Sequence, residues 1–138
     1  MKGFFNKLLR INLKNKRYSV EEIPDSVLEN TLGGKGLGTY LLLENNQKGV
    51  DPLSPENNFI ISLGPVSGTT IPGSSRYGIF TKSPLTGIFS ESYSGGHAAE
   101  PMSRTGYDAF ILEEASENPV YLEITEEEVV FHDAAHIW

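Results

Sequence analysis

Short apolar segments separated by turn-forming residues are the feature that most constrains the fold of this chain. Phe59–Leu63 is typical: it is rich in bulky apolar residues and lies between a polar loop and Gly64-Pro65. Such segments favour β-strands, and short connections between them favour antiparallel pairing. The sequence predicts strands at residues 4–12, 18–23, 59–63, 76–81, 88–93, 108–112, 120–124 and 128–132.

Three helical patterns lie between these strands, at residues 26–32, 36–44 and 98–106. The first can be capped by Asp25 or Ser26 and ends at Gly33-Gly34. Apolar residues at helical spacing predict the buried sides. The residues expected to face inward are Val27, Leu28, Leu32, Leu37, Tyr40, Leu41 and Leu43, and the third pattern carries Ala98, Ala99 and Met102. The pattern predicts an α+β fold of mostly antiparallel β-sheets with two or three short helices.

Composition narrows the classes of partner and site. The net charge is −7, and acidic residues crowd into the last third of the chain, so nucleic acid is not an expected partner. No apolar run is long enough to span a bilayer, and the first residues do not resemble a signal peptide, so a cytoplasmic location is expected. The chain has no cysteine, which excludes disulfides, thiolate zinc sites and an iron–sulfur cluster held by this chain alone.

Glycines gather beside the ends of the expected strands. Gly73 precedes Arg76, Gly95-Gly96 follows Tyr93-Ser94, and the segment 33–38 surrounds a lysine with glycines. Backbone amides at such positions can approach a bulky anion closely. Segment 33–38 matches neither a phosphate-binding loop nor a dinucleotide fingerprint, and a helix end running into a helix start explains it equally well.

Arg76 follows the small-residue loop directly, so its guanidinium can reach a phosphate or the edge of a heterocycle. A surface or salt-bridged arginine is the alternative from chemistry alone. His132 and His136 lack metal-ligand spacing on a common helix face, and no nucleophile elbow is present. The residues alone predict a binding scaffold with glycine-lined, partly cationic loops that suit a large anionic cofactor.

Several segments occur in an order that resembles the start of the aldehyde:ferredoxin oxidoreductase family. The segments are LLRINL (8–13), LGGKGLGTYLL (32–42), VDPLSPEN (50–57), GSSRYGIFTKSPLTG (73–87), SGG (94–96), GYDA (106–109) and DAAHIW (133–138). Each is weak by itself, but their collinear succession along the chain is specific.

The resemblance implies a tungsten cofactor held by two pterins, whose phosphates are joined through magnesium, in an enzyme that oxidises aldehydes to carboxylic acids and reduces ferredoxin. By this resemblance Arg76, Tyr93, Ser94, Gly95 and Gly96 bind the tungstopterin cofactor, and the backbone carbonyl of Tyr93 binds magnesium. The family commonly has asparagine where this chain has Tyr93, and Glu91 and His97 also differ from its pattern. No catalytic residue is expected in this chain.

Members of that family are several times longer, and they bind the 4Fe-4S cluster beyond the region that this chain resembles. Residues 1–138 are therefore expected to form a single, incomplete cofactor-binding domain that is inactive and binds no cofactor by itself. Its expected partners are the missing C-terminal domains and, through them, ferredoxin. Self-association through the uncovered surface is also expected. The alternative is a stand-alone, non-catalytic interaction or assembly module that retains the fold.

Overall fold

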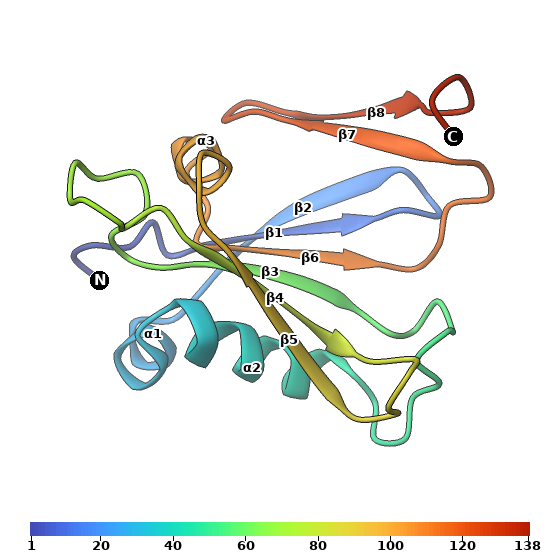
Figure 1. Cartoon of the computed structure of the whole chain (residues 1–138), viewed down its shortest axis with the longest axis horizontal. Coiled ribbons are helices and arrows are strands. Elements are labelled where there is room, and N and C mark those ends of the chain that lie inside the picture. The colour runs from blue at the N-terminus through green and yellow to red at the C-terminus, as the bar shows by residue number, and fades with distance from the viewer.

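A six-stranded sheet forms the centre of the protein, with the strand order β2-β1-β6-β3-β4-β5. The computed structural model describes all 138 residues (Figure 1). The strands of this sheet are β1 (Lys7–Asn12), β2 (Arg17–Glu22), β3 (Phe59–Leu63), β4 (Tyr77–Lys82), β5 (Phe89–Ser94) and β6 (Ala109–Glu113), and β7 (Val120–Ile124) pairs with β8 (Val129–Asp133) in a separate hairpin. The expected strands are confirmed to within a few residues.

Pairing in the central sheet is antiparallel except between β1 and β6, which run parallel. Leu9 lies opposite Phe110 in that parallel pair. A parallel pair needs a long crossover, and here the chain between β1 and β6 supplies it with β2 to β5 and all three helices. The predicted α+β architecture with mostly antiparallel sheets is confirmed.

The helices α1 (Asp25–Thr31) and α2 (Gly34–Asn45) cover one face of the sheet (Figure 1). Strand side chains alternate between the two faces, so every second residue of β1, β3, β4 and β6 meets these helices. The buried cluster on this face contains Leu8, Ile23, Leu28, Leu37, Leu41, Leu42, Ile60, Phe80, Ala109 and Ile111. Phe80 is fully buried here, and its ring packs directly over Gly38 of α2.

The opposite face is covered in part by α3 (Ala99–Arg104) and by the β7–β8 hairpin (Figure 1). Its buried cluster contains Leu9, Ile11, Leu63, Ala99, Tyr107, Phe110 and Val129. The side chain of Asp108 ties the N-terminal segment to this region, because its two oxygens accept hydrogen bonds from the amides of Phe5 and Lys7. No helix is long and apolar enough to cross a membrane.

Three details of the predicted helices are wrong. Leu32 is 65% exposed, because it adopts the left-handed conformation that ends α1 and points away from the sheet side. Tyr40 and Leu43 are exposed, whereas Leu42 is buried with Leu41, since the inward side of α2 is set by Leu37 and Gly38 and their neighbours one turn later. The N-cap of α1 is Pro24, and the carboxylate of Asp25 binds the terminal ammonium and Asn6 instead.

We expect Gly38→Ala to destabilise the protein. Alanine in a helix interior normally adds about 1 kcal/mol relative to glycine. Here the added methyl group would overlap the ring of Phe80, which is buried and cannot move aside. Overpacking of this kind lowers the free energy of unfolding by about 1–3 kcal/mol, which urea denaturation would measure.

The matched control is Gly38→Ala combined with Phe80→Leu, in which the smaller side chain makes room for the methyl group. The double variant should lose less stability than the sum of the two single changes. A Gly38→Ala protein that is more stable than the parent would contradict the packing described here.

Candidate functional site

The five residues predicted to bind a cofactor come together at one end of the β4–β5 pair. The ladder ends with Tyr77 opposite Ser94, so Arg76 lies directly before β4 and beside Gly95. The Ser75 hydroxyl donates a hydrogen bond to the carbonyl of Gly96, which closes the gap between the two chain segments. Arg76 was predicted within a strand and lies just before it. Tyr93 was predicted in a strand and lies in β5, whereas Ser94 was predicted to begin the turn and is the last residue of β5.

Two buried serines that the sequence did not single out hold Arg76 in place. The hydroxyl of Ser67 donates to the carbonyl of Arg76 at 2.9 Å. The hydroxyl of Ser103, on α3, donates in turn to the carbonyl of Ser67 at 2.8 Å. The backbone at Arg76 is thus fixed to α3 through side-chain hydroxyls. A serine within a small-residue loop was the only sequence signal, and it resembles that of an ordinary turn residue.

The turn after β5 has backbone N–H groups that are hydrogen-bonded to no acceptor within the protein. None of the backbone amides of Gly95, Gly96, His97 and Ala98 donates a hydrogen bond within the protein, and all four residues are exposed. Gly96 has a φ of 87°, a left-handed conformation suited to glycine, and open space surrounds the position of a Cβ atom there. Successive free amides of this kind form a concavity that favours anions.

Arg76 adds a positive charge beside these amides. Its side chain is exposed and takes part in no ion pair, although the chain as a whole is acidic. The free guanidinium retains its full capacity for a planar, bidentate contact with a phosphate or a heterocycle edge. Arg76 and the turn of residues 95–98, called here the amide turn, together form a site with several donors and no acidic side chain among its residues.

The side chain of Tyr93 lies on the α2 side of the sheet. Its hydroxyl donates to Glu91 at 3.1 Å, and its ring packs edge-on against Phe80 with centroids 6.0 Å apart. Gly78 makes this possible, because a Cβ atom there would lie 3.0 Å from the Tyr93 ring. Any contact between Tyr93 and a ligand at the amide turn would therefore be made by the backbone of Tyr93, not by its side chain. An asparagine side chain is not needed for a carbonyl contact at this position.

Segment 33–38 contains the N-cap residue and the first residues of α2, and its lysine makes a structural contact. The Nζ of Lys35 donates to Glu91 at 2.8 Å, so Lys35, Glu91 and Tyr93 form one hydrogen-bonded row along β5. The hydrogen bond from Lys35 is the main cause that lowers the pKa of Glu91. Partial burial, followed by the bond to Glu91, raises the pKa of Tyr93.

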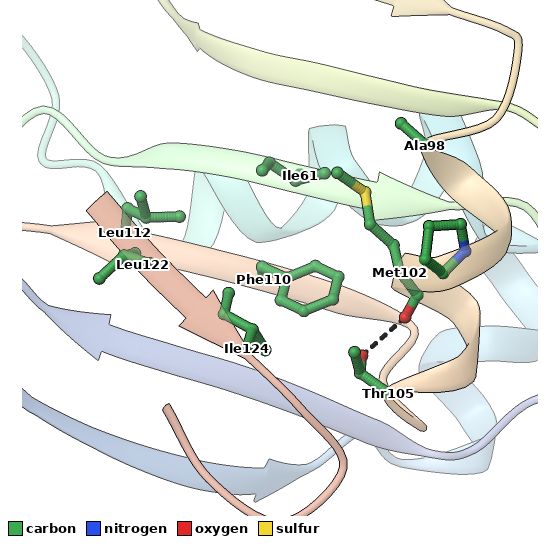
Figure 2. A pocket seen from close by; sticks show the side chains of 9 residues that line it. Ile61, Ala98, Met102, Thr105, Phe110, Leu112, Leu122 and Ile124 are labelled. Atoms are coloured by element: carbon green, nitrogen blue, oxygen red, sulfur yellow. Dashed lines mark hydrogen bonds between the residues drawn. The ribbon is translucent and has the colours of Figure 1, made fainter. Parts of the chain in front are cut away.

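An apolar groove of about 390 Å3 begins at Ala98, the last residue of the amide turn. Figure 2 shows Ile61 and Phe110 on its sheet side, Met102 of α3 on one flank, and Leu122 and Ile124 of β7 on the other. Its one hydroxyl, on Thr105, is already bonded to the carbonyl of Met102. The groove suits an apolar group and offers nothing to an anion.

The structure brings no metal-ligating side chains together. No group of three or more histidine or acidic side chains is arranged around a common point. His132 stacks on Tyr121 with ring centroids 4.7 Å apart and contacts Glu123, so it forms part of the surface of the hairpin. The candidate site has no acidic side chain, so a hard cation there would depend on backbone carbonyls for its oxygen ligands.

We expect Lys35→Met to raise the pKa of Glu91 toward the ordinary value of a glutamate. The charged form of Glu91 is favoured by the donor at Lys35, and methionine keeps the length of the side chain while removing that donor. Carboxyl carbon NMR shifts followed through an acid titration would measure it. Lys48→Met, at an exposed position without an ion pair, is the control. An unchanged Glu91 midpoint in Lys35→Met would contradict this row of bonds.

Known proteins match this chain along its whole length. Residues 8–138 match the family described as "Aldehyde ferredoxin oxidoreductase, N-terminal domain". The tungsten-containing aldehyde ferredoxin oxidoreductase of Pyrococcus furiosus is 43% identical over 138 residues, which cover 100% of this chain and 23% of that protein. The protein of the same name from Thermococcus kodakarensis is 41% identical, with the same coverage.

A solved structure has the same fold. A chain of the active-site complex BamBC of benzoyl coenzyme A reductase, in complex with 1,5-dienoyl-CoA, superposes with a TM-score of 0.94 at 30% identity, covering 98% of this chain and 21% of that one. This chain thus spans about a quarter of the length of its relatives, and the match begins at β1 and continues through the β7–β8 hairpin. The chain belongs to the aldehyde ferredoxin oxidoreductase family and corresponds to the N-terminal domain of that family's members.

Proposed function

We propose that this domain binds the tungstopterin cofactor of an aldehyde:ferredoxin oxidoreductase, at the amide turn and Arg76. One observation supports the proposal above the others: four successive unbonded amides, from Gly95 to Ala98, lie beside a guanidinium that has no acidic partner. Such a set of donors fits the phosphate and the polar ring edge of a pterin. Relatives that match the whole chain bear names that include tungsten.

The form of the site suits a bulky group. Gly96 leaves open space where a side chain would stand, and Gly95 has only the Ser75 carbonyl near its Cβ position, at 3.6 Å. A large planar ligand can therefore lie against the backbone. The carbonyl of Tyr93 is the proposed ligand for the magnesium that joins the pterin phosphates, since hard cations prefer oxygen donors and the Tyr93 side chain is held elsewhere.

The role of the chain's own residues is to bind and orient. Ser67 and Ser103 fix the backbone at Arg76 so that the guanidinium meets its ligand from a set position. When bound, the cofactor supplies the metal that oxidises an aldehyde to a carboxylic acid, with electrons passing to ferredoxin. The 4Fe-4S cluster in that route would be held outside this chain, which contains no cysteine.

The chain is proposed to act only together with the domains that follow it in longer relatives. It spans 23% of their length, so most of the protein around the cofactor would come from those domains. We expect the isolated chain to show no aldehyde oxidation with viologen dyes and to retain no stoichiometric tungsten. Turnover above background in the isolated chain would overturn this division of roles.

We expect Arg76→Ala to lower tungsten and pterin retention in a protein that joins this domain to the remaining domains of the family. Loss of a charge-assisted contact of about 1.5–3 kcal/mol corresponds to at least a tenfold weaker affinity. Elemental analysis of tungsten and fluorescence of the oxidised pterin would measure retention without relying on turnover. Arg76→Lys should retain an intermediate amount, because it keeps the charge and loses the planar fork.

The matched control is Arg17→Ala, which removes an exposed arginine from β2 at the other edge of the sheet. Its tungsten content should equal that of the parent protein. If Arg76→Ala and the parent retain equal amounts of tungsten and pterin, Arg76 is not part of the site. If the parent itself retains neither, the alternative of a non-catalytic interaction module is favoured.

A further inference from the structure

Two adjacent glycines leave the N–H groups of the amide turn without an intrinsic direction. Gly95 and Gly96 begin the turn, and Gly96 has a φ of 87° with open space around its Cβ position. Because glycine adopts positive and negative φ about equally well, the peptide groups beside these residues can rotate readily. Donors bind a ligand more tightly when their directions are fixed before it arrives. The contacts that fix these peptide groups are therefore part of the site.

Ser75 holds the peptide group between Gly96 and His97. Its hydroxyl donates a hydrogen bond to the carbonyl of Gly96, and that carbonyl accepts no other hydrogen bond. Ser75 and Gly96 lie opposite each other because each is two residues beyond the last pair of the β4–β5 ladder. The carbonyl of Ser75 is also close to the turn, 3.6 Å from the Cβ position of Gly95. Strand register and side-chain contact thus agree on this placement.

The bond from Ser75 sets the direction of the His97 N–H group. The carbonyl of Gly96 and the N–H of His97 belong to one planar trans peptide, in which the two groups point in opposite directions. With the carbonyl held by Ser75, the N–H of His97 points away from Ser75 and meets no acceptor in the protein. Ser94 acts similarly on the preceding peptide group, because its hydroxyl donates to the carbonyl of Gly95 at 3.3 Å.

Ser75 is itself held by residues on the other side of its loop. The hydroxyl of Ser67 lies 2.9 Å from the carbonyl of Arg76 and 3.4 Å from that of Ser74, so it grips the chain on both sides of Ser75. Ser103 of α3 bonds to the carbonyl of Ser67, and the amide turn leads directly into α3. The contacts therefore form a closed ring that runs from the amide turn through α3 and the serines and back to the turn.

From this ring we infer that Ser75 is a positioning residue, whose hydroxyl aims the N–H of His97 at the ligand and ties the amide turn to Arg76. The inference rests on the proposed function, since it concerns how the same donors are held ready for a pterin phosphate. Ser75 acts through Gly96 and need not touch the ligand. Removing its hydroxyl leaves every donor present and returns to the turn its freedom to rotate. The expected result is weaker binding by a chain that still folds.

The orientation of the turn can be measured in the chain without any ligand. Residual dipolar couplings of a weakly aligned sample report the directions of the N–H groups of Gly96 and His97. In Ser75→Ala the His97 coupling should shrink toward zero, because the peptide group samples several directions, while the couplings of β4 and β5 stay unchanged. Ser75→Thr keeps the hydroxyl and should keep the parent value. The matched control is Ser54→Ala, which removes a hydroxyl bonded to the carbonyl of Asp51 in another turn.

Cofactor retention provides the second measurement, in a protein that joins this domain to the remaining domains of the family. Ser75→Ala should bind tungsten and pterin about fivefold more weakly than the parent, which is the effect of one ordinary hydrogen bond. Ser75→Thr should restore retention, and Ser54→Ala should match the parent. The release of tungsten and of the fluorescent oxidised pterin during dialysis would measure these differences without relying on turnover.

Two results would overturn the inference. One is a His97 coupling that is the same in Ser75→Ala and in the parent, since the hydroxyl would then not set the direction of the N–H. The other is equal retention by Ser75→Ala and by a parent that holds the cofactor. A parent that retains neither tungsten nor pterin would instead overturn the proposed function, and the dipolar couplings, which need no cofactor, would still decide whether Ser75 aims the turn.

Discussion

The close approach of α2 to β4 is the constraint on which the rest of the structure depends. The ring of Phe80 fills the space left by the missing side chain of Gly38 and lies against Gly78 of its own strand. That contact sets the distance of α2 from the sheet and leaves room for Tyr93 on β5. The direction of β5, and with it the start of the amide turn, follows from the packing of one aromatic ring between two glycines.

The strands and helices could be predicted from local sequence because each is short and bounded by turn formers. The prediction of which residues of α1 and α2 face the core was wrong in part. Leu43 and Leu42 are equally apolar, and only the contact at Gly38 decides which of them is buried. The juxtaposition of Arg76 and Gly95 could be expected only by resemblance, since strand register fixes it. The buried bonds of Ser67 and Ser103 had no distinct signal. Serine in a loop of small residues, such as Ser67, usually satisfies its own turn, and Ser103 lies within the short helix α3.

An acidic chain can contain a site for an anion because the charges are separated in the fold. The acids of the last third gather in the β7–β8 hairpin and its turn, where Glu126, Glu127 and Glu128 are exposed. Exposed charges more than about 10 Å apart are largely screened at physiological salt. Glu91, which is closer in sequence, is held by Lys35 on the α2 side. Glu100, in the first turn of α3, is paired with Arg104. Arg76 therefore keeps a charge without an ion-pair partner at its end of the sheet.

β5 is an edge strand of the central sheet and leads directly into the candidate site. Its last residues precede the amide turn, and it pairs with β4 on one side only. A strand paired on one side only is held by half the hydrogen bonds of a central strand, so the position of the turn that follows it depends on side-chain contacts such as that of Tyr93 with Phe80. The start of the amide turn is therefore held from inside the sheet, by the packing of Tyr93 against Phe80.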